Sequence, residues 1–243
     1  MGAMLVRERY KVVWVLDARE DYAFAEAVDI LDREKGACLL NIYEGPLLRA
    51  YLPCFDQMQN CPAFRGMFLD GESLVTVFDT CGGEPIDRVF YRGDHHDWRT
   101  RLDYAERLLH QALSMADLPP EVSCAAMLSE NVRIDLKGDT LALRFQVVPL
   151  EGMNPRELVY LTCDQLRKIL LPRFASPVEE LALLDELDQG ACRSVVQLYA
   201  LWREREGALR AAYEVLDKKN FFRRWCALLW GRCKRWAARR KRR

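Results

Sequence analysis

The stretch from Glu121 to Gln146 constrains the fold of this 243-residue chain more than any other. Its first part is predicted to be a tight loop. Apolar residues then alternate with other residues on both sides of a turn at 137–139: Val132, Ile134 and Leu136 before it, and Leu141, Leu143 and Phe145 after it. Because side chains of a strand alternate between two faces, this period of two predicts a loop followed by a β-hairpin.

The same stretch resembles the catalytic loop and the metal-binding motif of protein kinases. The family pattern H-R-D-L-K-P-E-N aligns without a gap with Cys124 to Asn131, and D-F-G aligns with 144–146. In the family, the loop Asp accepts the proton of the substrate, whereas the loop Asn and the D-F-G Asp hold Mg²⁺.

Most of that chemistry is missing here. Ala126 replaces the loop Asp, Arg144 replaces the D-F-G Asp, and of these three functional residues only the Asn, Asn131, is kept. An arginine cannot give up its charge to admit a metal ion. The resemblance therefore implies a degenerate site without catalytic, cofactor-binding or metal-binding residues.

The first third of the chain resembles the small lobe of a kinase. Strands are predicted at 10–16, 22–31 and 37–44, and a two-stranded hairpin at 64–78. Between them, 46–60 is predicted to be a helix. The glycine-rich phosphate loop of the family is replaced by an acidic turn at 17–21, and its third-strand Lys by Asn41. The plainer interpretation of Asn41 is a strand residue near the lobe cleft with no ligand. The helix also lacks the Glu that would pair with the missing Lys.

The rest of the chain up to residue 217 is predicted to be mostly helical. Apolar spacing of three and four predicts a long helix at 98–115, and further helices are expected at 157–171, 177–187 and 191–216. The expected fold class is α+β, kinase-like and two-lobed. It comprises a five-stranded antiparallel N-lobe at 1–79, a shortened helical C-lobe at 80–217 and a basic tail at 218–243.

The cysteines and the apolar runs predict a location. Nine cysteines are scattered without a C-x-x-C pair, which argues against a structural zinc site and favours a reducing cytosol. No secretory signal and no apolar run of about 20 residues is apparent. We expect a cytoplasmic protein, with association to a membrane through its tail. His95 and His96 are predicted to lie in a solvated loop rather than to bind metal.

The tail contrasts with the body of the chain. Residues 218–243 carry 12 Lys or Arg and no acid, which leaves 24 basic and 36 acidic residues in 1–217, a net charge of −12. Phe221 and Phe222 add aromatic rings, and Cys226 and Cys233 are candidates for acylation. The residues expected to meet an anionic membrane or partner are Arg223, Arg224, Trp225, Trp230, Arg232, Lys234, Arg235, Trp236, Arg239 and Arg240.

Several interpretations of this tail are open, among them solvated disorder and a solvated segment ahead of a membrane span that lies outside this sequence. An anionic membrane surface is favoured, docking on the acidic body or on a protein partner comes next, and nucleic acid comes last.

Three functions are open at this point. The leading hypothesis is a catalytically inactive pseudokinase, serine/threonine kinase-like in plan, that needs no cofactor. It would act as a scaffold or regulatory module for an unidentified protein partner and be held at the cytoplasmic membrane face. The second is a divergent protein or small-molecule phosphotransferase that uses Glu130 or Asp135 with Asn131. The third is an α/β binding protein unrelated to kinases, with a nucleic-acid-binding tail.

Overall fold

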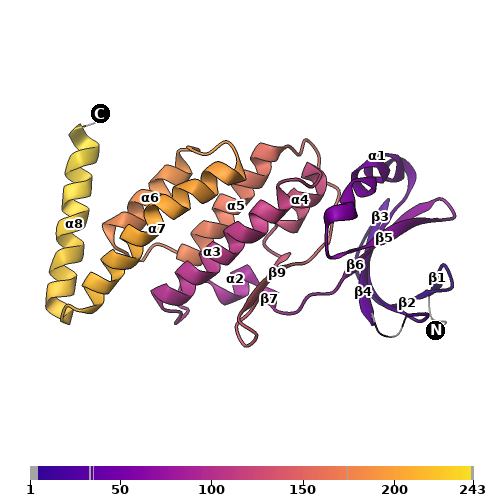
Figure 1. The fold of residues 1–243 in the computed structure, drawn as a ribbon, viewed down its shortest axis with the longest axis horizontal. Coiled ribbons are helices and arrows are strands. Elements are labelled where there is room, and N and C mark those ends of the chain that lie inside the picture. Colours follow the sequence, from indigo (N-terminus) through magenta and orange to yellow (C-terminus); the bar gives the residue numbers. More distant parts are fainter. Residues whose placement is uncertain (1–4, 33, 35, 174, 242–243) are drawn as a thin grey trace. The chain divides into compact units, whose positions relative to one another are not determined.

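The computed structural model describes residues 5–32, 34, 36–173 and 175–241, with side chains described up to residue 233. The chain divides into two compact units (Figure 1). Unit 1 comprises Met1–Pro85 and Met115–Leu158, and unit 2 comprises Ile86–Ser114 and Val159–Arg243. The segment around the predicted catalytic loop therefore groups with the N-terminal sheet. The boundaries expected at 79 and 217 stay predictions.

An antiparallel sheet dominates unit 1. Its described strands are β1 (Leu5–Val6), β2 (Tyr10–Arg19), β3 (Tyr22–Asp29), β4 (Ala37–Tyr43), β5 (Phe64–Asp70) and β6 (Ser73–Asp79), in the order β1-β2-β3-β4-β6-β5. The sheet thus has six strands rather than the predicted five. The additional strand β1 has two residues, which is too short for any periodic pattern to reveal it.

The turn between β2 and β3 is tighter than predicted. Asp17 lies in β2 opposite Phe24, and Arg19 pairs with Tyr22, so that only Glu20 and Asp21 form the turn. The prediction that β2 ends at Leu16 and that 17–21 forms a loop is therefore wrong. A kinase phosphate loop needs several free backbone N–H groups, and a two-residue turn has few to offer.

The two faces of this sheet pack differently. One face curls around a buried apolar cluster of Val6, Tyr10, Ala27, Cys38, Leu40, Ile42, Val75 and Val77, with Phe68 at its margin. The other face is covered in part by α1 (Gly45–Asp56), whose Tyr51 and Phe55 contact Tyr43. Helix α1 continues past Pro53, and the 3₁₀ helix η1 (Met58–Asn60) follows it.

The predicted hairpin of unit 1 is present. Strands β8 (Val132–Asp135) and β9 (Thr140–Leu143) pair with each other, and β7 (Glu84–Pro85) joins β8 to make a three-stranded sheet. The loop predicted ahead of it is wrong, because 120–126 forms helix α4 (Pro120–Ala126). Prolines end helices but also occupy the first turn of new ones, and Pro120 opens α4.

Unit 2 is helical. Its elements are α2 (Ile86–Val89), α3 (Trp98–Met115), most of α5 (Pro155–Leu170), α6 (Val178–Asp188), α7 (Val195–Asp217) and α8 (Phe221–Lys241). The predicted stripe of α3 is buried, with Leu102, Ala105, Leu108, Leu109 and Ala112 almost fully removed from solvent. Ser194 precedes helix α7, and its hydroxyl oxygen caps the helix by accepting a hydrogen bond from the N–H of Gln197.

Candidate functional site

The side chain of Asn41 is buried in unit 1, and all three of its described hydrogen bonds are internal. Its Oδ1 accepts from the hydroxyl of Tyr22 at 2.9 Å and from the N–H of Val147 at 2.8 Å. Its Nδ2 donates to the carbonyl oxygen of Phe145 at 3.0 Å. Asn41 therefore links the segment after β9 to strand β4.

Asn131 holds the same segment from the other side. Its Nδ2 donates to the carbonyl oxygen of Gln146 at 3.0 Å and to that of Ala125 at 2.7 Å. Its own carbonyl oxygen accepts from the N–H of Arg144 at 2.8 Å. Consecutive residues 145, 146 and 147 are thus bonded by two asparagine side chains, which we call the asparagine clamp (Asn41, Asn131 and 145–147).

Tyrosine hydroxyls extend the clamp. The hydroxyl of Tyr43 donates to the carbonyl oxygen of Val147 at 2.7 Å, and the hydroxyl of Tyr51 accepts from the N–H of Leu150 at 3.1 Å. Burial raises the pKa of Tyr22 and of Tyr43 well above the ordinary value, so both hydroxyls stay protonated and remain donors. The sequence reasoning missed these tyrosines, although Tyr43 lies two residues after Asn41 and so on the same face of β4.

Arg144 lies where the resemblance places a metal-binding Asp. Its guanidinium group stands 4.8 Å from the centre of the Phe24 ring. Burial, and then the charge of Arg133, lower the pKa of Arg144. Within the described part of the chain, no carboxylate lies within ion-pair distance of it. The next residue, Phe145, is buried and stacks on Phe78, with ring centres 4.9 Å apart.

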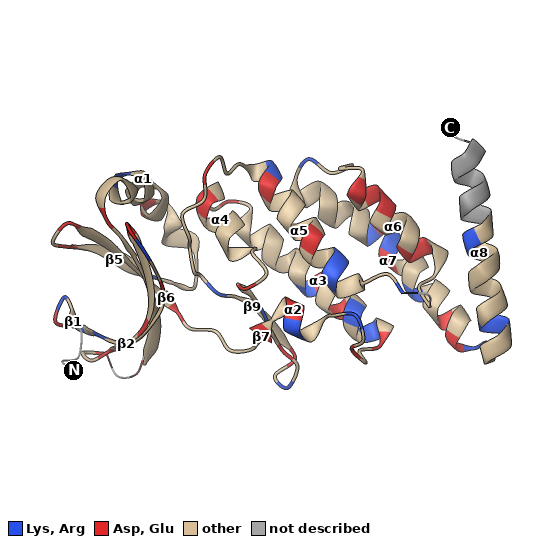
Figure 2. Ribbon diagram, turned by 180° about the vertical axis from the view of Figure 1, so that it is seen from behind, with Lys and Arg blue, Asp and Glu red and all other residues tan. Residues whose placement is uncertain are grey.

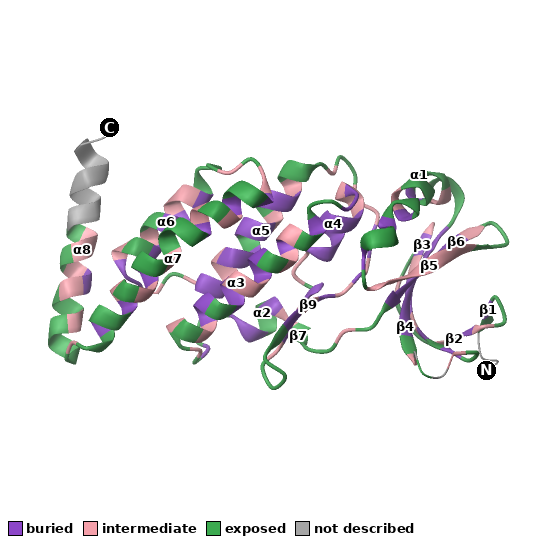
Figure 3. Cartoon of the chain, in the orientation of Figure 1, coloured by how far each residue is buried: buried purple, intermediate pink, exposed green. Residues whose placement is uncertain are grey.

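Ala126 is fully buried at the end of α4, and Figure 3 shows this helix as largely buried. Ala126 therefore does not reach solvent. The structure still brings the two aligned motifs together, because Asn131 bonds both to Ala125 and to Gln146. The alignment of the motifs is spatially consistent, but the chain itself fills the place between Asn41 and Asn131.

The side chains of Glu130 and Asp135, the acids predicted to serve a relocated catalytic site, make no described contact with the asparagine clamp. Asp135 accepts a hydrogen bond from the N–H of Lys137 at 2.9 Å within the β8–β9 turn, and Glu130 is exposed. Among the described residues, no cluster of three or more His, Cys, Asp or Glu side chains has the arrangement of a metal site. The groups that meet at the clamp are amides, hydroxyls and backbone, which can hold a chain segment but supply no charge to a phosphate.

The tail forms helix α8, whose described part carries basic and no acidic residues (Figure 2). Arg223, Trp225 and Trp230 are exposed, and so are Phe221 and Phe222. Arg224 instead pairs with Asp217 at 3.4 Å, and Arg232 donates to the carbonyl oxygen of Arg173 at 2.8 Å. The remaining predicted contacts lie outside the described side chains: Lys234, Arg235, Trp236, Arg239 and Arg240.

Helix α8 is anchored within unit 2 by one of its sides. Leu228 is buried, whereas Phe222, Cys226, Trp230 and Cys233 are exposed at a spacing of three and four. That spacing places these four residues on one side of the helix. None of the described helices is long and apolar enough to pass through a membrane.

Comparisons with known proteins identify the fold. No protein-family model matches the sequence, and no curated protein matches it at a significant level. Among solved structures, the chain is similar to the PknI kinase domain of Mycobacterium tuberculosis, crystallised as a C20A_R136N double mutant. The TM-score is 0.57 at 12% identity, and the match covers 85% of this chain and 99% of that chain. The chain has a protein kinase-like fold, which weighs against an α/β protein unrelated to kinases.

Proposed function

We propose that this chain is a pseudokinase: a kinase-like module that transfers no phosphate and acts by binding a protein partner. The observation that carries the proposal is the asparagine clamp. Backbone of 145–147 occupies the space between Asn41 and Asn131, which align with the family's ATP-binding Lys and one of its metal-binding residues. Releasing this segment would leave buried N–H and C=O groups without partners, at about 1–3 kcal/mol each.

The charges around the clamp support the same proposal. Arg144 places a cation where Mg²⁺ would need an oxygen ligand, and Ala126 supplies no proton acceptor. The β2–β3 turn consists of Glu20 and Asp21, whose negative charges oppose a triphosphate. These features lie in one compact unit, so a single altered residue would not restore phosphate transfer.

A titration with ATP and Mg²⁺ tests this proposal. A ligand present at 100 times its Kd would stabilise the native state by about 2.7 kcal/mol. We expect no Mg²⁺-dependent change in the thermal unfolding midpoint and no heat of binding in calorimetry. A clear Mg²⁺-dependent shift, or transfer of radiolabelled phosphate that Asn131→Ala abolishes, would favour a divergent phosphotransferase instead.

The variant Arg144→Asp sharpens this test. If Arg144 alone excludes the metal ion, restoring an acid at this position should produce Mg²⁺-dependent ATP binding. If the clamp blocks the site, as we propose, Arg144→Asp should bind no better than the parent chain. Lys137→Asp, in the exposed β8–β9 turn, is the matched control, because it changes the net charge by the same amount.

For the tail, we propose that α8 holds the module at an anionic membrane surface. Its exposed side carries Phe222 and Trp230, with Arg223 exposed beside them. Aromatic rings favour the membrane interface, and each nearby cation contributes about 1 kcal/mol on an anionic surface. Arg224 and Arg232 take no part in this proposal, because they bond within unit 2.

Vesicle co-sedimentation tests the role of α8. We expect the intact chain to pellet with anionic vesicles and to remain in solution with neutral ones. The double variant Phe222→Ser and Trp230→Ser should lose most of the pelleting, whereas Tyr160→Ser, at an exposed aromatic on α5, should not. Equal pelleting of the double variant and the parent would exclude this side of α8 as the membrane contact.

A further inference from the structure

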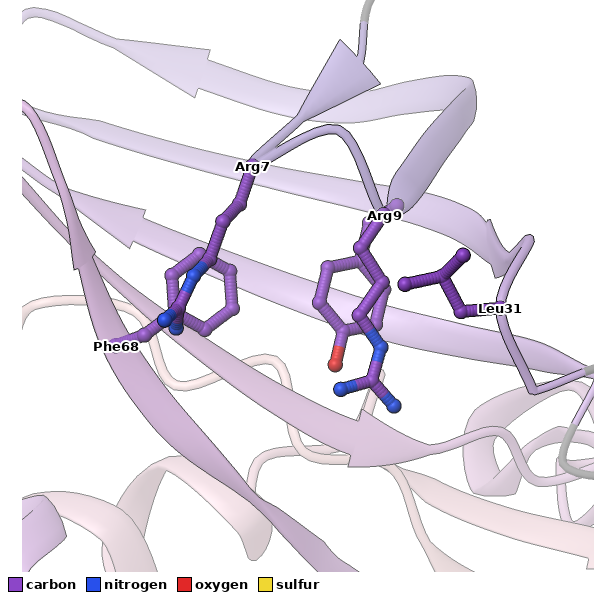
Figure 4. A pocket seen from close by; sticks show the side chains of 5 residues that line it. Arg7, Arg9, Leu31 and Phe68 are labelled. Atoms are coloured by element: carbon purple, nitrogen blue, oxygen red, sulfur yellow. The ribbon is translucent and has the colours of Figure 1, made fainter.

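A pocket of 290 Å³ lies on unit 1, away from the asparagine clamp. It is lined by Arg7, Arg9, Tyr10, Leu31 and Phe68, which come from the β1–β2 hairpin, the chain after β3, and β5. Figure 4 shows the guanidinium group of Arg7 over the ring of Phe68, and Arg9 and Leu31 beside it. Its size suits a group of about one amino-acid residue, near the lower limit of small-molecule sites.

The turn that carries Arg7 has an unfavourable backbone conformation. Arg7 and Glu8 have φ values of 51° and 52°, and the N–H of Arg9 donates to the carbonyl oxygen of Val6 at 3.2 Å. This is a type I′ geometry, in which Asn and Gly are strongly preferred. Two ordinary side chains in this geometry are disfavoured, and the turn places Arg7 5.0 Å from the centre of the Phe68 ring.

The two arginines of the pocket differ in their pairing. Arg9 forms hydrogen bonds of 2.7–3.0 Å to both carboxylate oxygens of Asp29, so that its charge is balanced. For Arg7, the part of the chain that the structure describes provides the Phe68 ring and no carboxylate within ion-pair distance. The pocket therefore holds about one unbalanced positive charge.

The hydroxyl of Tyr10 is a second polar group of the pocket. Tyr10 is 6% exposed, and its ring stacks on Phe68 with centres 5.6 Å apart. Its hydroxyl has no hydrogen-bond partner among the residues that the structure describes. This hydroxyl is not among the fully enclosed polar groups, so it is accessible to a ligand in the pocket and can donate a hydrogen bond to it.

We propose that this pocket binds a carboxylate attached to an apolar body of about one residue. Arg7 would balance the negative charge, Tyr10 would donate a hydrogen bond, and Phe68 and Leu31 would contact the apolar part. One unbalanced cation matches a monoanion better than a phosphate monoester, which carries close to two negative charges. Apolar walls also favour a ligand that is more than a bare anion. The proposal is independent of the clamp and of the tail.

Calorimetric titration with N-acetyl-L-phenylalanine tests the proposal, with N-acetyl-L-phenylalaninamide as the neutral probe of equal size and inorganic phosphate as the bare anion. We expect binding with a Kd on the order of 1 mM. The amide and phosphate should bind at least about tenfold more weakly, because each lacks half of the recognised chemistry. A short peptide ending in phenylalanine distinguishes a free acid from a chain terminus as the source of the ligand.

Variants of the pocket assign the contacts. Arg7→Gln should weaken carboxylate binding about tenfold and Tyr10→Phe about threefold, since the first removes a charged donor and the second a neutral one. Arg19→Gln, at the far end of β2, is the matched control and should bind as the parent does. Thermal unfolding of each variant shows that it is folded.

Three results would overturn the proposal. They are equal affinity for the acid and the amide, equal affinity of the parent and Arg7→Gln, and the absence of binding at 10 times the expected Kd of about 1 mM. Tighter binding of phosphate than of the acid would overturn the carboxylate assignment.

Discussion

Two arginines that are largely withdrawn from water have opposite environments. Arg101, in α3 of unit 2, is 4% exposed and bonds to both carboxylate oxygens of Asp94 at 2.5 Å and to the carbonyl oxygen of Ile169. Arg173 shares the same carboxylate at 2.6 Å. Arg144, in unit 1, is half-buried and has the ring of Phe24 as its described partner.

The two units offset the desolvation cost of an arginine side chain in different ways. In unit 2 the cost of desolvation is offset by a carboxylate and by backbone acceptors, so each group depends on the others. In unit 1 it is reduced by partial exposure and by the electron-rich face of a ring. The ion pair of Arg101 therefore stabilises the fold of unit 2. Arg144 has no such carboxylate among the described residues, so we expect its side chain to contribute little to the free energy of unfolding.

The largest effect is expected from Asp94→Ala. The change leaves Arg101 buried without its carboxylate and Arg173 without its ion-pair partner. Loss of one member of a buried pair lowers the free energy of unfolding by about 3–5 kcal/mol. Urea denaturation measures it. Arg19→Ala, which breaks the pair of this exposed arginine with Asp17, is the control and should cost less than about 1 kcal/mol. Similar losses for the two variants would remove the distinction between the arginines.

Asn41→Ala should have the next largest effect. It leaves the N–H of Val147, the carbonyl oxygen of Phe145 and the hydroxyl of Tyr22 without their side-chain partner, in a region closed to water. We expect the free energy of unfolding to fall by about 2–4 kcal/mol, and amide exchange of residues 145–147 to accelerate. Asn60→Ala, at an exposed position, is the control. If Asn41→Ala left exchange unchanged, the hydrogen bonds of Asn41 would not be what holds the segment.

The pH dependence of the free energy of unfolding tests the ion pair between Arg101 and Asp94. Burial alone would raise the pKa of Asp94, but hydrogen bonds from Arg101 and Arg173 outweigh it and hold this pKa well below its ordinary value. A lowered pKa in the folded state stabilises the protein above the unfolded pKa of about 3.9, and this stabilisation is lost as the pH falls toward the folded pKa. The difference in stability between the parent and Asp94→Asn should therefore narrow below about pH 4.

The sequence anticipated those parts of the fold that depend on local periodicity. The β8–β9 hairpin and α3 follow from alternation and from spacing of three and four, and both are present. Strand β1 and helix α4 were not anticipated, because two residues carry no period and Pro120 can either end a helix or begin one. The kinase-like fold rests on the order and spacing of elements, which survive when catalytic side chains are replaced.

The candidate site was anticipated in its positions and not in its contacts. Alignment identified Asn41, Asn131 and Arg144, and the structure brings their segments together. That the backbone of 145–147 would fill the space between the asparagines is a long-range outcome. It joins residues about 100 positions apart, which no local pattern encodes. The contact between Arg144 and the ring of Phe24 could not be predicted from the sequence for the same reason.

The smallest effect is expected from Arg144→Met, and it is the most direct test of the comparison. The variant loses a contact between cation and ring worth about 0.5–2 kcal/mol, but it also removes the cost of desolvating the guanidinium group. These terms oppose each other, so we expect the free energy of unfolding to change by about 1 kcal/mol or less. Arg101→Met, the matched control, should lower it severalfold more, because Asp94 loses a buried partner. Since the N–H of Arg144 and not its side chain bonds to Asn131, the clamp should persist in Arg144→Met. A decrease in the free energy of unfolding larger than about 2 kcal/mol, measured by urea denaturation, would show that Arg144, like Arg101, stabilises the fold of its unit.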